Sequence, residues 1–463
     1  MRYQSLIFCL TTLALATRAL AGVSAQEAAR LGGQELTPVG AERAGNAAGT
    51  IPAWTGGITG PIPGYQPGEH HRDPFPDDPI LFTISDANQE RYADKLSEGQ
   101  KALLRAYPSW RMNVYRSRRS AAYPEFVYQA LKSNAVNARL VPTGKGGVRD
   151  SELSSPFPIP DQGLEVVWNH NLRWRGMYVE RSNGTAAVTR RGFYRMVIVK
   201  EEIAFPYGFP YEHSIKTRFP ELLAAFKQKL VSPGSQSGFG QLSLEPLDYS
   251  DRTRNTWLYS ANLRRVFRTP FAGLDHPAPN SDALRTVDQF DMFNGTPYLF
   301  DWTLLGKREI YVPYNAYRLH SKELAYSDIL GKKHINVDLA RYELHRVWVV
   351  EGVLDPAVER RDIPGGRPNH IYSKRVFYLD EDSWQIVLTE DYDHEDQLWR
   401  VGEGHVINYY EVPVPWTTME VWYDLKTRRY LVSGLDNRRL PYRFSEKGNP
   451  KNFSPNALNY YVR

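Results

Sequence analysis

The 463-residue sequence contains a single cysteine, and that cysteine lies close to the N-terminus. Cys9 falls within an apolar run that we expect to be removed, so the mature chain would carry no thiol. This excludes disulfides, a thiol nucleophile and a thiolate metal site from the predicted mature protein. A chain of this length can bury enough surface to fold without covalent cross-links.

Apolar runs long enough to cross a membrane are also missing. The N-terminal run LIFCLTTLALA has 11 residues, fewer than a membrane-spanning helix needs. It follows Arg2 and precedes Ala19-Leu20-Ala21, a small-residue pattern typical of signal peptidase cleavage. We therefore predict a cleavable signal peptide at residues 1–21, with an alternative cleavage site after Ala25, and a periplasmic mature protein. Phe8 stands before Cys9 where a lipoprotein signal needs a small residue, so we expect no lipid anchor.

A strong charge of either sign is lacking. The formal net charge is +5, and loss of Arg2 and Arg18 with the signal peptide would leave +3. Basic and acidic residues alternate without a long basic block, so we do not expect the protein to bind nucleic acid. Aromatic residues, by contrast, make up 13% of the chain, which is the main peculiarity of its composition.

Motifs of common hydrolases are absent as well. The segment GSQSG at 234–238 has Gln236 where a nucleophile elbow needs serine, and H-E-x-x-H does not occur. Paired carboxylates could serve glycoside hydrolysis, and Asp301 with Glu309, or Asp380 with Asp382, are candidates. An acid in a turn, however, more often stabilises the turn itself. We therefore predict no catalytic residues and a protein that is not an enzyme.

Two segments resemble metal sites only in part. His70 and His71 are adjacent, and on an extended chain their side chains point to opposite sides. The acidic segment EDYDHED (390–396) begins like a calcium loop, but Asp396 stands where that loop needs glycine and Gly402 where it needs glutamate. We predict neither a metal site nor a cofactor.

The chain divides into an extended N-terminal strap at residues 22–80 and a main body at 81–463. Residues 49–79 hold 7 prolines and 6 glycines, which excludes long helices and central strands. Apolar residues such as Ile51 and Tyr65 recur within this segment, so we expect the strap to pack over the main body. A short helix around Ala25–Leu31 precedes it.

Helical and strand patterns follow in the main body. Apolar spacing predicts helices over 84–108, Glu125–Asn134 and 217–231. Asn183-Gly184 between two strand-like runs predicts a hairpin. Residues 255–269 predict a strand, a tight turn and a second strand.

The last third predicts an antiparallel meander. Short β-type runs are separated by turn residues such as Asp380–Ser383. Val347–Val350 is apolar on both strand faces, so the sheet should be covered on both sides. Residues 300–314 predict two paired strands about Gly306-Lys307. The fold class is therefore α+β, with one large antiparallel sheet.

Three long segments resemble the bacterial family called domain of unknown function 1329. They are AARLGGQELTPVGAERAGNAAGTIPAWTGG, DQFDMFNGTPYLFDWTLLGKREIYVPYNAYRL and SKRVFYLDEDSWQIVLTEDYD. The resemblance implies an exported protein of Gram-negative bacteria with a fold like the lipoprotein carriers LolA and LolB, in which a curved half-barrel sheet wraps around helices and leaves a cavity for acyl chains. It also implies an RND-type exporter and an outer-membrane protein as partners, and it brings no catalytic residues.

These observations predict a monomeric periplasmic carrier for a lipid or another hydrophobic small molecule. A non-carrier structural subunit of an envelope complex, and a sugar-binding protein or hydrolase, remain as alternatives. Aromatic residues at strand positions are the predicted cavity lining, although each of them could equally belong to the core. They are Trp257, Tyr259, Phe267, Trp302, Tyr311, Trp348, Phe377, Trp384 and Trp422.

Overall fold

The computed structural model describes residues 22–141, 146–234, 238–249, 252–270, 273–356 and 370–463. The predicted signal peptide, with Cys9, lies outside these residues. One 16-stranded sheet dominates the described chain, in the order β1-β2-β12-β13-β14-β15-β16-β17-β5-β6-β7-β8-β9-β10, while β11 pairs with β12 and β18 with β5. A separate two-stranded sheet joins β3 (Arg139–Leu140) and β4 (Val148–Arg149).

The strands of the large sheet fall into two groups along the chain. The first comprises β1 (Phe82–Ile84), β2 (Met112–Val114), β5 (Tyr178–Val188), β6 (Met196–Ala204), β7 (Leu222–Ser232), β8 (Gly240–Pro246), β9 (Asn255–Ser260) and β10 (Arg265–Arg268). The second comprises β11 (Phe300–Pro313), β12 (Tyr342–Leu354), β13 (Lys374–Asp380), β14 (Ile386–Tyr392), β15 (Leu398–Tyr409), β16 (Val414–Asp424), β17 (Arg429–Leu435) and β18 (Arg443–Ser445).

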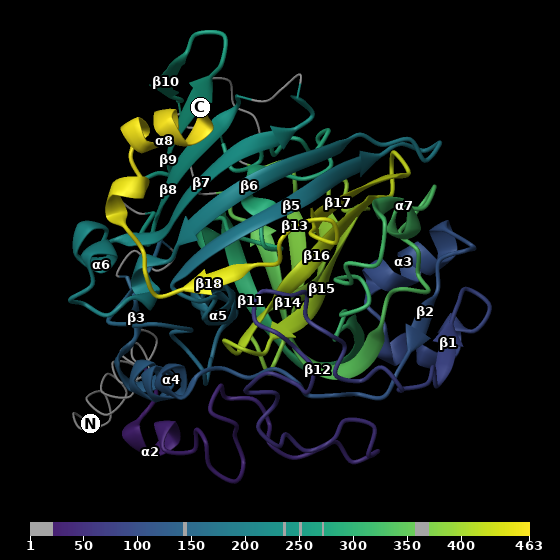
Figure 1. The fold of residues 1–463 in the computed structure, drawn as a ribbon. Coiled ribbons are helices and arrows are strands. Elements are labelled where there is room, and N and C mark those ends of the chain that lie inside the picture. Colours follow the sequence, from purple (N-terminus) through teal and green to yellow (C-terminus); the bar gives the residue numbers. More distant parts are fainter. Residues whose placement is uncertain (1–21, 142–145, 235–237, 250–251, 271–272, 357–369) are drawn as a thin grey trace, which may run out of the picture.

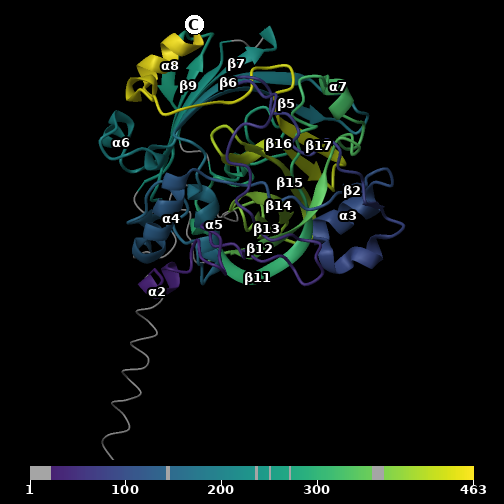
Figure 2. The same ribbon diagram turned by 60° about the horizontal axis from the view of Figure 1, so that its bottom comes forward.

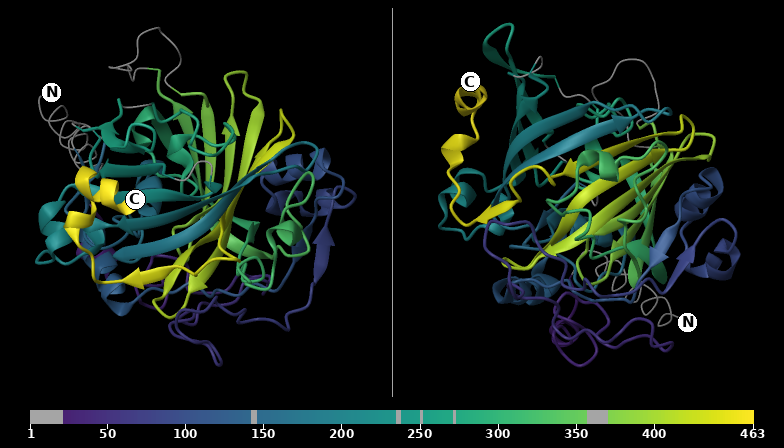
Figure 3. Two further views of the ribbon diagram at one scale, coloured as in Figure 1. Left: turned by 45° about the horizontal axis from the view of Figure 1, so that its top comes forward. Right: turned by 45° about the vertical axis from the view of Figure 1, so that its right-hand side comes forward.

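The sheet curves strongly. In Figure 1 the teal strands β5–β7 cross over the green and yellow strands β13–β16, and Figure 3 shows the same curl from two other sides. All its pairings are antiparallel except a single parallel bridge between β2 and β12. The predicted α+β fold with one large curved antiparallel sheet is confirmed, and the predicted meander of the last third forms β12–β17.

Short helices surround and fill this curve. The α-helices are α2 (Ala25–Ala28), α3 (Glu98–Ala106), α4 (Glu125–Asn137), α5 (Gly163–Leu172), α6 (Ser214–Arg218), α7 (Tyr326–Ile329) and α8 (Pro455–Val462). The 3-10 turns are η1 (Gln89–Lys95), η2 (Pro206–Gly208), η4 (Val287–Gln289), η5 (Pro297–Leu299) and η6 (Pro450–Asn452). Among the described residues, no helix is both long and apolar enough to cross a membrane.

Several predicted helices are confirmed, and other elements, α5 among them, were missed. The helix after Pro124 forms as α4, and Ser24 caps α2 with a reciprocal bond to Glu27. The expected helix over 84–108 is divided into η1 and α3, because Ser97 makes a capping box that starts a new helix. No element was predicted for α5, whose residues other than Glu165 are buried inside the curve of the sheet. A helix that is buried all round lacks the amphipathic stripe that marks a surface helix.

Three local predictions are wrong, each because sheet pairing overrides a local signal. Asn183-Gly184 makes no turn and lies within β5, paired with β6. Residues 222–232 form β7 between β6 and β8, although their apolar spacing also fits a helix. Residues 300–313 form the single strand β11, and Gly306, at φ 97°, serves a β-bulge opposite β12.

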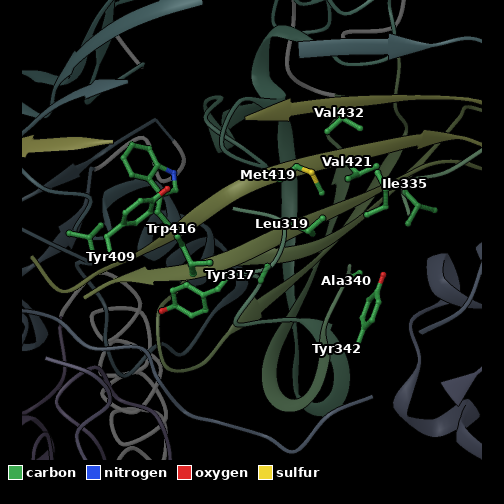
Figure 4. Close-up of a cluster of buried hydrophobic side chains, with 14 of the residues drawn as sticks. Tyr317, Leu319, Ile335, Ala340, Tyr342, Tyr409, Trp416, Met419, Val421 and Val432 are labelled. Carbon is green, nitrogen blue, oxygen red and sulfur yellow. The ribbon is translucent and has the colours of Figure 1, made fainter. Parts of the chain in front are cut away.

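The largest buried cluster lies where β12 and β15–β17 meet the long connection between β11 and β12. Figure 4 shows part of this cluster, with Leu319 from the connection beside Met419 of β16. A second cluster lies around α5, where Val166 and Val167 pack against Phe377 and Trp384. Both faces of β12–β16 are therefore covered, as the apolar pattern of Val347–Val350 predicts.

The N-terminal segment runs as an extended chain along one side of the molecule, drawn in purple at the bottom of Figures 1 and 2. Ile51 and Tyr65 of this segment are buried in the main core. The Trp384 indole donates to the carbonyl of Val39 at 3.1 Å. The strap is thus packed on the main body along much of its length, and its proposed limits at residues 22 and 80 stay a prediction.

Candidate ligand-binding cavity

A cavity of about 420 Å³ lies inside the curve of the sheet. One wall is formed by β6–β9, and the opposite side by residues 269–270 and 276–294 together with Trp416 of β16. This volume falls within the range of small-molecule sites in proteins. The apolar part of the lining consists of Ile203, Phe205, Leu223, Ala224, Phe226, Leu258, Pro270, Pro277, Pro279, Val287, Phe290 and Trp416.

Strand register explains which side chains face this cavity. Ile203 lies opposite Phe226, Phe226 opposite Ser243, and Ser243 opposite Thr256, so one row crosses four strands on a single face. Side chains of a strand alternate between the two faces of the sheet. The neighbouring residues Ala225 and Leu242 consequently point to the other face.

That other face is packed against the C-terminal helix. Leu458 of α8 and Phe453 lie in one buried cluster with Ala225, Leu242 and Tyr259. Figure 3 shows α8, in yellow, outside the teal strands. The same strands therefore bury one face against α8 and turn the other toward an open volume.

The cavity face of β8 is polar, whereas its packed face is apolar. Gln241, Ser243 and Glu245 line the cavity, while Leu242 and Leu244 pack on the opposite side. A search of the sequence for apolar strand faces would therefore select the face of β8 that packs, not the face that lines the cavity. The alternation of polar and apolar residues identifies the cavity face only once the position of α8 is known.

Charged side chains gather at the end of the cavity where β6 ends and β9 begins. Arg175 and Asp291 form an ion pair of 2.6 Å, and the Arg175 guanidinium lies 4.4 Å from the ring centre of Phe205. Arg173 binds the other oxygen of Asp291 at 2.6 Å. Burial opposes ionisation of this carboxyl, but the two arginines outweigh it and hold the pKa of Asp291 well below its usual range.

A second ion pair, Glu245 with Arg254, completes this end. Both side chains line the cavity and are more than nine-tenths buried. Burial raises the pKa of Glu245, although the Arg254 charge opposes that rise. Glu245 Oε1, Arg254 Nη2 and Arg175 Nε have no hydrogen-bond partner among the described residues.

The candidate carboxylate pair Asp301 and Glu309 is not brought together. The two residues lie eight positions apart on β11, which at about 3.3 Å per residue separates them by roughly 26 Å. A glycosidase pair is about 5–9.5 Å apart. Glu309 instead accepts a hydrogen bond from Asn46 of the strap at 3.0 Å.

The pair Asp380 and Asp382 lies in the buried turn between β13 and β14. Ligand atoms of these acids and His345 all lie within 4.8 Å of one another, which is close enough for a metal site. Arg119, however, binds both oxygens of Asp382 at 2.7 and 2.8 Å. Burial, with the neighbouring charge of Asp382, raises the pKa of Asp380 to about 7. With Asp382 already paired, the cluster has the character of an ion-pair network.

This network attaches the strap to the sheet. Arg119 donates to the carbonyl of Glu42 at 2.8 Å, and Arg346 to that of Ala44 at 2.6 Å. Glu381 accepts bonds from Arg346 and from the Glu42 amide. The acidic turn that could have suggested catalysis therefore stabilises the strap.

The other two metal-like segments are also engaged in local contacts. His71 bonds His320 at 3.3 Å and the ring of His70 packs 4.8 Å from that of His320, so both strap histidines contact one residue of the main body. In the acidic segment, Asp391 binds Arg375 at 2.9 Å and Asp393 pairs with Lys426.

None of the nine predicted lining residues is among the described residues that line this cavity. Five lie in or against the cluster around α5: Trp302, Trp348, Phe377, Trp384 and Trp422. Trp302 and Trp422 cover glycines of neighbouring strands, since a Cβ on Gly352 or Gly402 would lie less than 3 Å from their rings. Tyr311 packs in the main core against Phe82 and Tyr92.

The three predictions on β9 and β10 come nearest to the cavity. Trp257 and Tyr259 pack toward α8, one residue out of phase with Thr256 and Leu258, which line the cavity. Phe267 lies opposite Leu258 in the register and is 38% exposed. Ligand contact by the nine residues stays a prediction.

Comparison with known proteins gives consistent matches. The family model described as a protein of unknown function (DUF1329) matches residues 83–459. An uncharacterized protein of Pseudomonas aeruginosa is 42% identical over 450 residues, covering 96% of this chain and 95% of that protein.

Two crystal structures are similar at lower identity. A DUF1329 family protein from Desulfovibrio piger is 12% identical with a TM-score of 0.41, over 61% of this chain and 92% of that one. A LolA superfamily protein from Nitrosomonas europaea is 10% identical with a TM-score of 0.37, over 64% and 98%.

Proposed function

This chain belongs to the family of proteins of unknown function DUF1329, and we propose that it binds a hydrophobic ligand in the cavity between β6–β9 and residues 269–270 and 276–294. The observation that carries the proposal is the cavity itself. It is walled mainly by apolar side chains, yet it lies inside a sheet that is otherwise densely packed. Transfer of apolar ligand surface from water into such a site is favourable by about 25 cal/mol per Å².

The proposal extends to a carrier that works in the periplasm. The location rests on the predicted signal peptide, and the exporter and outer-membrane partners rest on the family resemblance. No chemical step is assigned to the chain. Release to a partner would require that the partner favour a conformation with lower affinity for the ligand.

Native mass spectrometry of protein purified gently from periplasm tests the proposal directly. We expect a fraction of the protein to carry an additional mass that organic extraction releases as a lipid or similar molecule. A clean ligand-free mass in repeated preparations, together with no uptake of a neutral apolar dye, would contradict the proposal. It would leave a non-carrier structural subunit as the stronger alternative.

A variant that fills the cavity tests whether the ligand binds at this site. Ala224 lines the cavity, so Ala224→Phe should remove dye binding while the chain stays folded. Phe267→Ala is a second variant, because Phe267 extends the row of Leu258 toward the sheet edge. Reduced binding in Phe267→Ala would show that this one of the nine predicted residues contacts ligand. Full dye binding in Ala224→Phe would place the site elsewhere.

A further inference from the structure

The charges around the cavity do not balance. Among the described residues at the end where β6 stops and β9 starts, Arg173, Arg175 and Arg254 pair with two carboxylates, Asp291 and Glu245. Asp291 stays ionised because its pKa is held low, but its single negative charge is shared between ion pairs with Arg173 and Arg175. One positive charge is therefore left without a partner carboxylate in a buried place.

The remaining charged side chain of the lining does not supply the missing anion. Arg181 lines the cavity farther along the strands, where it pairs with Glu201 of β6. That pair is neutral in sum, and Glu201 lies opposite Arg181 in the register. The excess positive charge stays at the Arg175 end.

Hydrogen-bond donors at this end are unused as well. Arg175 Nε and Arg254 Nη2 are buried and have no acceptor among the described residues. A buried charged donor without a partner is destabilising by several kcal/mol unless another group satisfies it. An anionic oxygen at this end would offset the excess charge and accept a bond from one of these donors.

The apolar part of the lining lies on the same side of the strands. Phe226 and Leu258 line the wall beyond the Glu245–Arg254 pair, at increasing distance from the charged end along β7 and β9. A ligand that places an anion at the charged end would thus lay an apolar tail along these side chains.

We infer that the ligand of this cavity is an amphiphile with a single anionic head group and an apolar tail. This inference rests on the proposed function, and it adds the chemical class of the ligand. A free long-chain carboxylate and a lysophospholipid with one phosphodiester share this chemistry. The head lies at Arg175 and Arg254, and the tail extends along Phe226 and Leu258.

Competition against a neutral fluorescent probe, N-phenyl-1-naphthylamine, tests the inference on the whole mature protein. The competitors are dodecanol, dodecanoate and 1-lauroyl-lysophosphatidylglycerol, which differ in the head group. We expect dodecanoate to bind about tenfold more tightly than dodecanol, because a tenfold ratio needs only about 1.4 kcal/mol of head-group interaction. Still tighter binding by the lysolipid would identify the phospholipid as the source of the anion.

Two substitutions at one ion pair should move that ratio in opposite directions. Glu245→Gln removes a negative charge from the cavity wall and should raise the dodecanoate-to-dodecanol affinity ratio severalfold. Arg254→Gln removes a positive charge and should lower the ratio by a similar factor. A purely structural role of the pair would change both affinities together and leave their ratio constant. If Arg254→Gln does not fold, Glu245→Gln alone still shows in which direction the affinity ratio changes when the charge of the wall is altered.

Arg265→Gln is the matched control, since it removes the same charge from an exposed position on β10 outside the cavity lining. Its ratio should equal that of the unmodified protein. Probe binding with equal affinity for dodecanol and dodecanoate, insensitive to both substitutions, would overturn the anionic head and leave the proposed function intact. Absence of all probe and competitor binding would overturn both.

Discussion

The half of the sheet around β12–β16 and the half around β6–β9 treat their two faces differently. In the first half, α5 fills one face, the strap and its ion-pair network cover the turn between β13 and β14, and β14, β15 and β16 are buried almost throughout. In the second half, α8 covers one face and the other borders a cavity. The first half holds the chain together, whereas the second leaves volume for a ligand. This difference yields four predictions, from the largest expected effect to the smallest.

Loss of the Arg119 guanidinium should be the most damaging change. Arg119→Met would leave Asp382 buried without its partner and would remove the bond to the Glu42 carbonyl. We expect the free energy of unfolding to fall by about 5 kcal/mol, the upper end of the range for breaking a buried ion pair. Urea denaturation measures this. Arg30→Met, at an exposed ion pair with Glu35, should change stability by less than about 1 kcal/mol.

Truncation of an aromatic residue should lower the free energy of unfolding by different amounts in the two halves of the sheet. Phe377→Ala would leave a hole beside α5, where the side chain is fully buried, and should lower the free energy of unfolding by about 4 kcal/mol. Phe267→Ala, on the exposed strand β10, should lower it by less than about 1 kcal/mol. Similar losses in the two variants would show that the halves are packed alike.

The packed half should also respond to pH through Glu403. Burial raises the pKa of this side chain on β15 from 4.5 to about 8, and among the described residues its hydrogen-bond donor is the Tyr342 hydroxyl, at 2.9 Å. The folded state therefore holds a proton that the unfolded state loses between pH 4.5 and 8. The contribution of Glu403 to the free energy of unfolding should be most favourable below pH 4.5. It should fall by about 2–4 kcal/mol as the pH rises to 8.

Glu403→Gln isolates that contribution, since the amide keeps the shape and cannot ionise. The difference in unfolding free energy between the unmodified protein and the variant should change across this pH range. A constant difference would mean that Glu403 ionises normally in the folded protein.

Filling one face or the other of a single strand should have the smallest effect on stability. Ala224→Phe enters the cavity and should change the free energy of unfolding by less than about 1 kcal/mol. Ala225→Phe meets the packing of α8 and should destabilise by about 1–3 kcal/mol, as overpacking does. Thermal unfolding of the two variants, side by side, tests whether the cavity is empty space. Equal destabilisation would mean that both faces of β7 are filled.

Sequence patterns predicted those elements whose signals are local and strong. Pro124 and the apolar spacing after it indicated α4, and the turn Asp380–Ser383 marked the junction of β13 and β14. They failed where pairing with the strands on either side decides. The Asn183-Gly184 signal and the helical spacing of 222–230 both gave way to the sheet, because each segment gains hydrogen bonds from two neighbouring strands.

The candidate site illustrates the same limit. Aromatic content correctly indicated strands, but an aromatic side chain on a strand fits a core and a cavity equally well. Trp257 and Tyr259 alternate along β9 with the lining residues Thr256 and Leu258, and their side chains therefore point to the opposite face of the sheet. The charged residues Arg175, Glu245 and Arg254 carried no motif, since they are far apart in the chain and meet only when β5–β9 pair.

By itself, the sequence determined the family, the antiparallel sheet, the small net charge and the lack of a thiol outside the N-terminal run. These properties depend on composition and on short-range order, which the chain carries whatever its neighbours are. Only the tertiary structure decided which face of β6–β9 meets α8 and which meets the cavity. That choice depends on where α8 and residues 276–294 pack, because a strand presents two faces and its own sequence does not say which of them will be covered.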